Sequence, residues 1–375
     1  MSSILESIKK IFSSGHRGSV VGIDIGSSSI KIIEIKKTDD KAVLQNYGEI
    51  SLGPRAGVSL GQATNMPPER IAEALRDLLR ETGIVIHHVS FAIPFSSSLL
   101  SVVEFPDVGK GQLDTMVPLE ARRYIPVPLA DVLLDWWIIP KRKKEVKPKT
   151  VADSGAPSLG KVEVILVAIH KEVMRKYEVI KKELGLTDTP SHFEIEIFST
   201  LRSVAGSEIS SLMIIDIGAA STKLVIIDEG MVRGSHVVSM GGQDISFAVS
   251  KSLNISFDEA EQMKCRVGMV GEEEGRDIAT AADLITSNIM NEAARFANSY
   301  ESKHGTILSK IILVGGGSRL KGMGKIVEQN LQGKEILLGN PFARVSTPAF
   351  LTPTLKEIGQ DFSVAIGAAM RGLGE

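Results

Sequence analysis

The amino-acid sequence predicts an α/β protein made of two related lobes. Short apolar runs typical of buried strands alternate along the chain with amphipathic helical patterns. A polar hairpin sequence near the beginning, "IDIGSSSIKIIEI", returns about 190 residues later as "IDIGAASTKLVII", with aspartate, glycine, serine and lysine at the same spacing. The chain has 375 residues, 43% of them hydrophobic, which is enough for roughly two to four compact units.

The first half of the chain opens with strands and continues with mixed elements. One helix is well marked, because Pro67 and Pro68 stand at its start and Gly83 follows its apolar face. The lysine-rich segment 141–161 carries no aromatic residue that could stack on bases, so it indicates a solvated hairpin loop rather than a nucleic-acid patch. The other expected elements are strands at 20–25, 30–35, 42–50, 87–94, 99–106 and 162–169, and helices at 112–124 and 171–186.

The second half opens on the repeated hairpin and is then mainly helical. Helices are expected from about Ser246 to Lys303. Segment 310–331 is typical of a buried strand, a glycine turn and a helix, and 362–373 of a final helix. The chain therefore ends as an α/β unit like the one with which it begins.

Composition excludes several classes of protein. A formal net charge of −2 argues against a nucleic-acid partner, and the single cysteine, Cys265, excludes an intramolecular disulfide. No Cys/His spacing matches a zinc site, and no apolar run is long enough to span a bilayer or to form a secretory signal. We therefore expect a cytoplasmic protein. Residues 1–12 predict a short basic amphipathic helix, which lies either on a membrane surface or on a protein.

The repeated hairpins predict a phosphate and metal site. Glycine lets the backbone pass close to a ligand, and turn N–H groups and hydroxyls bind phosphate oxygens. Asp24 and Asp216, each at the end of a strand, would hold Mg²⁺ through water. The alternative is two ordinary hairpins with polar turns. The residues expected to face the nucleotide are Gly26, Ser27, Ser28, Ser29 and Lys31 in the first hairpin, and Gly218, Ala219, Ser221, Thr222 and Lys223 in the second.

A third glycine-rich turn lies near the end of the chain. Gly315, Gly316, Gly317 and Ser318 join a strand to a helix, whose N-terminal N–H groups would face an anion or a sugar. The turn is not a Walker A loop, because Met323 stands where the lysine is required. It is not a dinucleotide fingerprint either, because Leu320 replaces the last glycine.

Together these three elements resemble the actin, heat-shock chaperone and sugar kinase ATPase superfamily. Within it the chain resembles the PilM family of type IV pilus assembly proteins, which is related to the division protein FtsA. The segments "EARRYIPVPLADVLLDW", "LNISFDEAEQMK" and "AIGAAMRGL" also resemble this family. The resemblance covers nearly the whole chain and implies an actin-like ATPase fold, with a nucleotide cleft between two pseudo-symmetric lobes and an FtsA-type insert.

The resemblance also implies a division into four subdomains. The first comprises 18–87 and 168–210, and it is interrupted by the insert, 88–167. The third comprises 211–255 and 310–375, and the small helical fourth is 256–309.

Further site residues follow from the resemblance alone. Glu261 and Lys264 would contact the ribose and adenine, Gly241 and Gly242 the phosphates, and the segment from Gly315 to Arg319 the adenosine. The alternative for Glu261 and Lys264 is a solvent-facing helix pair. Glu196 matches the acidic residue that would orient the attacking water, although Ile197 replaces the usual proline; the alternative is a surface carboxylate at the end of a strand.

The function implied by the resemblance is that of an ATP-loaded, Mg²⁺-dependent adaptor. Such a protein lies on the cytoplasmic face of the inner membrane, binds the N-terminal tail of a PilN-like membrane protein and works with other pilus assembly components. Its groove would lie between the first subdomain and the insert, where residues 124–127 are either groove wall or core. ATP would be hydrolysed slowly at most. The alternatives are a small-molecule kinase and an FtsA-like filament protein, and self-association stays open.

Overall fold

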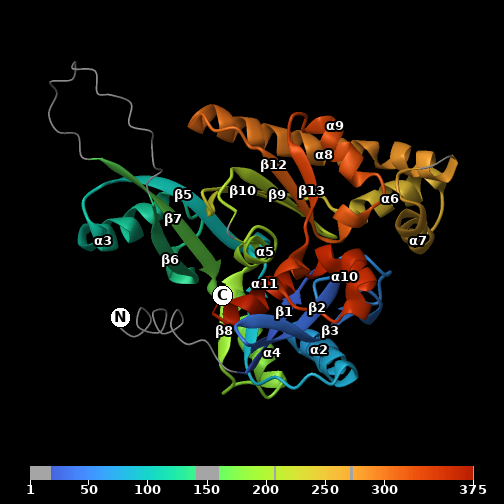
Figure 1. Cartoon of the computed structure of the whole chain (residues 1–375), viewed down its shortest axis with the longest axis horizontal. Helices are drawn as coiled ribbons and strands as arrows, with labels where there is room; N and C mark the ends of the chain where they lie inside the picture. The colour runs from blue at the N-terminus through green and yellow to red at the C-terminus, as the bar shows by residue number, and fades with distance from the viewer. Residues whose placement is uncertain (1–17, 141–159, 207, 271–272, 375) are drawn as a thin grey trace.

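The computed structural model describes residues 18–140, 160–206, 208–270 and 273–374. Two five-stranded sheets with the same internal order form the cores of the two lobes (Figure 1). The expected helix at 1–12 and nearly all of the expected loop at 141–161 lie outside these residues.

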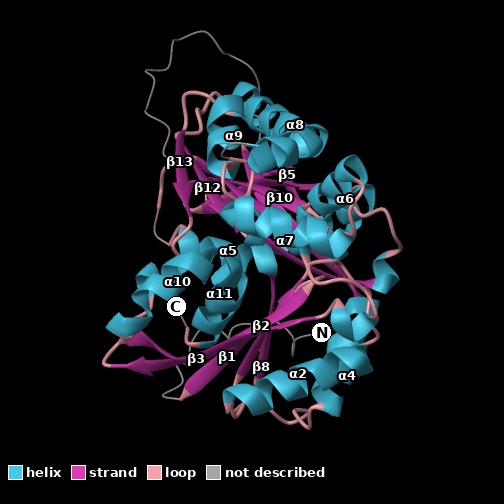
Figure 2. Cartoon of the chain, turned by 90° about the vertical axis from the view of Figure 1, so that its right-hand side faces the viewer, coloured by secondary structure: helices cyan, strands magenta, loops and turns pink. Residues whose placement is uncertain are grey.

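The first lobe is built on a sheet of order β3-β2-β1-β4-β8. The opening hairpin supplies β1 and β2, which pair antiparallel, while β4 and β8 continue the sheet in parallel. Helices α2 and α4 cover one face, and α10 and α11 lie on the other (Figure 2). The bounds are β1 Ser19–Ile25, β2 Ser29–Thr38, β3 Lys41–Ser51, α2 Pro68–Thr82, β4 Val89–Ile93, α4 Lys171–Glu183, β8 Ser191–Ile195, α5 Glu196–Val204, α10 Thr352–Ile358 and α11 Ser363–Gly372.

The second lobe repeats this plan with the order β11-β10-β9-β12-β13. The second hairpin supplies β9 and β10, and β12 joins β9 in parallel, as β4 joins β1. Helices α6 to α9 cover one face of this sheet, and their apolar side chains pack with those of the strands in one buried core. The bounds are β9 Leu212–Ile217, β10 Thr222–Asp228, β11 Met231–Val238, α6 Gly242–Leu253, α7 Phe257–Val267, α8 Glu273–His304, β12 Lys310–Val314, α9 Met323–Asn330 and β13 Glu335–Leu338.

A third, three-stranded sheet of order β5-β7-β6 forms the insert. It consists of β5 (Ser98–Pro106), α3 (Lys110–Glu120), β6 (Val132–Ile139) and β7 (Lys161–His170). One face packs on α3. The other shares a buried core with the strands of the second lobe. The insert therefore contacts both lobes and is not an appendage of the first.

The helix at the end of the chain is buried against the first lobe. It was expected to close the third subdomain, but α11 lies between the first sheet and α5. A Cβ added at Gly22 would lie 2.0 Å from the Ala365 carbonyl oxygen, and one at Gly367 would lie 1.8 Å from that of Ser199. Glycine at both positions lets the backbones approach this closely. The end of the second half of the chain thereby packs into the first lobe.

Most expected elements form, with differences at a few boundaries. Strands β6 and β8 and helix α5 were not predicted as separate elements. Helix α6 begins at Gly242, ahead of the expected Ser246. Strand β4, at the start of the range proposed for the insert, pairs with β1 in the first sheet. Within the described residues, no helix combines the length and the apolar character that crossing a membrane requires.

Candidate functional site

The two hairpins have the same geometry in the two lobes. Asp24 lies opposite Lys31 across the first hairpin, and Asp216 lies opposite Lys223 across the second. The turns close identically: the Gly26 N–H donates to the Ser29 carbonyl at 3.0 Å, and the Gly218 N–H donates to the Ser221 carbonyl at 3.0 Å. The repeat seen in the sequence is therefore a structural repeat, which places an acid and a base on adjacent strands in each lobe.

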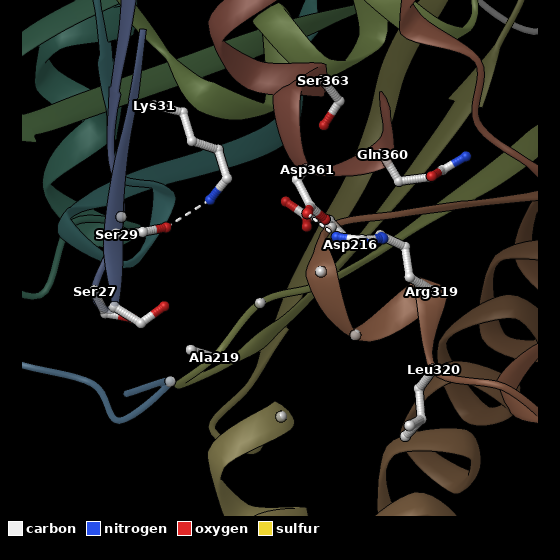
Figure 3. A pocket seen from close by; sticks show the side chains of 18 of the residues that line it. Ser27, Ser29, Lys31, Asp216, Ala219, Arg319, Leu320, Gln360, Asp361 and Ser363 are labelled. Atoms are coloured by element: carbon white, nitrogen blue, oxygen red, sulfur yellow. Dashed lines mark hydrogen bonds and ion pairs between the residues drawn. The ribbon is translucent and has the colours of Figure 1, made fainter. Parts of the chain in front are cut away.

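Both hairpins line one cavity of about 590 Å³ between the lobes. Figure 3 shows Ser27, Ser29 and Lys31 on one side of this cavity and Arg319 and Gln360 on the other. Asp24 and Asp216 both line it. The acids and the glycine turns thus face a common space large enough for a nucleotide.

The third glycine turn packs directly on the second hairpin. Gly315 has a φ of 78°, and a Cβ there would lie 2.3 Å from the Asp216 Oδ1. A Cβ at Gly317 would lie 2.3 Å from the Ile217 side chain. The glycines allow the turn to pass beside Asp216 without filling the cavity. An α-helix does not follow at once as expected, because a short 3₁₀ turn, Gly316–Arg319, precedes α9 at Met323.

Lys223 is the charged centre of the second hairpin. Its Nζ donates to the Glu196 Oε2 at 2.8 Å and to the Asp216 Oδ2 at 3.3 Å. Burial lowers the pKa of Lys223, but Asp216 and Glu196 outweigh it and raise the pKa above its ordinary value. Lys223 therefore stays protonated and compensates these two acids.

The first hairpin carries a different charge balance. Burial raises the pKa of Asp24 to about 7, and the charge of Lys31 opposes that shift. Lys31 donates to the Ser29 hydroxyl at 2.7 Å and pairs with Glu49 at 3.1 Å. A divalent cation beside Asp24 and Asp216 would supply the positive charge that favours both carboxylates. The donor set therefore fits Mg²⁺, which would be held by these two acids and by waters.

Helices α6 and α7 form the far side of the cavity through a buried polar network. Lys264, only 7% exposed, donates to Glu261 at 2.6 Å, to the Ser246 hydroxyl at 2.8 Å and to the Gly242 carbonyl at 2.9 Å. The alternative of a solvent-facing pair is wrong for Glu261 and Lys264. Gly61, from the first lobe, approaches Glu261 so closely that a Cβ there would lie 2.7 Å from its carboxylate.

Three residues expected at the site do not line the cavity. The Thr222 hydroxyl is buried and donates to the Met240 carbonyl at 2.9 Å, and the Ser318 hydroxyl donates to the Gly315 carbonyl at 2.7 Å. A Cβ at Gly241 would lie 2.5 Å from the Ala219 carbonyl oxygen. These residues support the turns instead. The expected residues that do line the cavity are Asp24, Gly26, Ser27, Ser28, Ser29, Lys31, Glu196, Asp216, Gly218, Ala219, Ser221, Lys223, Gly242, Glu261, Lys264, Gly315, Gly316, Gly317 and Arg319.

Other residues that line the cavity were not predicted from the sequence. Asp361, just before α11, pairs with Arg319 at 2.5 Å, and burial raises its pKa. Its Oδ1 is buried without a hydrogen-bond partner. Gln243 accepts a hydrogen bond from the Ala63 N–H at 3.0 Å, which joins the lobes. Asp361 stands in no motif, whereas Gln243 directly follows the predicted site residue Gly242, and that neighbour is the signal that could have located it.

Comparison with solved structures supports the architecture. The "PilM-PilN type IV pilus biogenesis complex" contains a chain that superposes with a TM-score of 0.78 at 23% identity, covering 96% of this chain and 99% of that one. The ethanolamine utilization protein EutJ from Carboxydothermus hydrogenoformans gives a TM-score of 0.53 at 14% identity, covering 97% and 94%. The predicted actin-like ATPase fold is thereby confirmed.

Sequence comparison identifies the family. The cell division protein FtsA of Neisseria meningitidis is 23% identical over 369 residues, covering 88% of this chain and 87% of the relative. FtsA of Bacillus subtilis is 21% identical over 367 residues, covering 88% and 81%. The model of the family described as "Type IV pilus assembly protein PilM" matches residues 22–373. The chain therefore belongs to the PilM family of type IV pilus assembly proteins.

Proposed function

We propose that this chain binds Mg-ATP in its cleft and acts as an adaptor of the type IV pilus inner-membrane complex. The observation that carries the nucleotide part is the pair of Asp/Lys hairpins that line one cavity together with a glycine turn. Asp24 and Asp216 would hold the metal, the hairpin turns the phosphates, and Glu261, Lys264 and Arg319 the nucleoside. Bound Mg²⁺ would neutralise phosphate charge.

The adaptor binds the N-terminal tail of a PilN-like membrane protein, which places the chain at the cytoplasmic face of the membrane. The solved relative whose title names PilM and PilN supports this choice of partner. The tail binds where the insert meets the first lobe, near the contact between the Lys171 Nζ and the Ala130 carbonyl at 2.6 Å. Of the residues expected there, Ile125 is core, whereas Tyr124 is 41% exposed and offers an aromatic surface.

ATP serves to set the angle between the lobes and is turned over slowly at most. The Glu196 carboxylate, which would have to orient a water, already accepts hydrogen bonds on both oxygens, from the Phe95 N–H at 2.6 Å and from Lys223 at 2.8 Å. It is 6% exposed, and the alternative of a surface carboxylate is wrong. Each oxygen keeps one acceptor site and Glu196 lines the cavity, so a water would have to share this carboxylate with Lys223 and the Phe95 N–H, which is why we expect slow turnover. The proposal includes the four subdomains implied by the resemblance, although α11, at the end of the third, packs on the first lobe.

The tail-binding surface is tested with a synthetic N-terminal peptide of the partner. We expect a Kd in the micromolar range or tighter, on the order of −8 kcal/mol. Tyr124→Ala should weaken binding about tenfold, because exposed aromatic residues contribute strongly to interfaces. The matched control is Phe350→Ala, which removes an exposed aromatic side chain outside the insert. No binding by titration calorimetry at high peptide concentration, or equal losses in the two variants, would contradict this surface.

The metal site is tested through its pH dependence. Asp24, with a pKa of about 7, must lose its proton to bind Mg²⁺, so the affinity for Mg-ATP should rise about tenfold between about pH 6 and pH 8. The same raised pKa means that, without a cation, Asp24 contributes stability at low pH that is lost as the pH rises through 7. Calorimetry measures the affinity. Asp24→Asn is the control, because its remaining slope reports the titration of the nucleotide, and an equal slope in both proteins contradicts the role of Asp24.

A further inference from the structure

Glu196 joins three parts of the molecule through one carboxylate. It is the first residue of α5 in the first lobe. Its Oε2 accepts from Lys223 in the second-lobe hairpin at 2.8 Å, and its Oε1 accepts from the Phe95 N–H at 2.6 Å. Since the Glu196 side chain is only 8% exposed, water does not readily replace either partner.

Phe95 stands where the chain leaves the first sheet for the insert. Pro94 separates it from the end of β4, and Ser96 and Ser97 separate it from the start of β5. The residue is only 6% exposed, and its side chain packs in the core that the insert shares with the second lobe. A shift of the Phe95 backbone would therefore change how the side chains of the insert pack against the second sheet. The insert and the second sheet are also joined by an ion pair: the buried Arg233 of β11 pairs with Glu163 of β7 at 2.5 Å.

Lys223 connects Glu196 to Asp216, one of the two aspartates proposed to hold the metal. It shares its charge between Glu196 and Asp216, and Asp216 lines the cavity with Asp24. Phosphate oxygens of a bound nucleotide would compete with Glu196 for the Lys223 ammonium, and a divalent cation would compete with Lys223 for Asp216. Either competition weakens the pairing of Glu196, and a buried carboxylate that loses its counter-charge must move or find another partner. A movement of the carboxylate would shift the Phe95 backbone, because the Phe95 N–H donates to Oε1 of the same carboxylate.

We propose that Glu196 is a positioning residue that couples Mg-nucleotide occupancy of the cleft to the position of the insert. This inference rests on the proposed function and adds the route by which ATP acts on the insert, the part of the molecule that holds the proposed tail-binding surface. It assigns Glu196 a role other than water activation. The coupling passes from Asp216 through Lys223 and Glu196 to the Phe95 amide.

The test is hydrogen exchange of the full-length protein with and without saturating Mg-ATP, followed by mass spectrometry. In the wild type, segments 94–106 and 161–170 should change their exchange rates at least about threefold on Mg-ATP addition. Glu196→Gln keeps an acceptor for the Phe95 N–H but removes the ion pair with Lys223. It should therefore leave the nucleotide-free exchange of these segments unchanged and abolish most of their response to Mg-ATP.

Two further variants keep the test decisive. Glu194→Gln removes a carboxylate of similar burial that pairs with Arg202 outside the cavity, and it should keep the wild-type response. Lys223→Gln breaks the same link from the other side, so it should lose the response even if Glu196→Gln does not fold. Calorimetry on each protein establishes the nucleotide concentration needed for saturation.

The outcomes separate this inference from the proposed function. A wild type that binds Mg-ATP without any change in the insert overturns the coupling alone. A Glu196→Gln protein that responds as the wild type does also overturns it. A wild type that does not bind Mg-ATP by calorimetry refutes the proposed function and removes the coupling with it.

Discussion

Replacing Asp216 with alanine is expected to weaken Mg-ATP binding on the order of 100-fold, about 2.8 kcal/mol. Asp216 is the second-last residue of β9, is 7% exposed and lines the cavity together with Asp24. Without it one of the two carboxylates proposed for the metal is lost, and Lys223 is left with Glu196 as its remaining acid. Because Lys223 stays compensated, we expect the fold to persist. Titration calorimetry measures the loss, and circular dichroism checks the fold.

The control for this prediction separates charge from shape. Asp216→Asn keeps the size of the side chain and should lose nearly as much affinity as alanine. Glu194→Gln removes a carboxylate of similar burial outside the cavity, and it should bind Mg-ATP as the wild type does. An Asp216→Asn protein whose affinity stays within about twofold of wild type would show that Asp216 serves only to compensate Lys223.

Replacing Gly367 with alanine is expected to destabilise the protein strongly, although alanine is the better helix former by about 1 kcal/mol. Gly367 lies inside α11, and its new Cβ would lie 1.8 Å from the Ser199 carbonyl oxygen, a backbone atom of α5. A backbone atom cannot rotate away, so α11 must move off α5 or off the first sheet. We expect a loss of about 3 kcal/mol and a decrease in Tm of about 4 °C, measured by thermal denaturation.

The matched control is another glycine in a helix. A Cβ at Gly324 in α9 would meet no atom within 4 Å, so Gly324→Ala should be neutral or slightly stabilising. If Gly367→Ala were as stable as Gly324→Ala, the close contact of α11 with α5 would not exist in solution.

The repeated hairpin predicted more of the fold and of the candidate site than any other part of the sequence. Strand alternation, a glycine at the turn and an acid facing a base are set by residues close together in the chain, so the pattern reveals them directly. The same holds for α2, where Pro68 starts the helix and Gly83, with a φ of 68°, ends it. Two such hairpins, one in each half, were enough to predict two lobes and a metal between Asp24 and Asp216.

Tertiary contacts decided what the local pattern left open. Thr222, Gly241 and Ser318 stand inside site motifs, yet they support the turns and do not reach the cavity. Asp361 lies in the cavity without any motif to mark it. Motif spacing locates a turn, but the direction of each side chain depends on which elements pack against it.

The sequence by itself determined the two lobes and the paired acidic turns, because these depend on short-range periodicity and on repeated local spacing. Only the tertiary structure placed the last helix on the first lobe, fixed the insert against the second lobe and put Glu196 between Lys223 and Phe95. Those contacts join residues far apart in the chain, and close packing of specific side chains selects them.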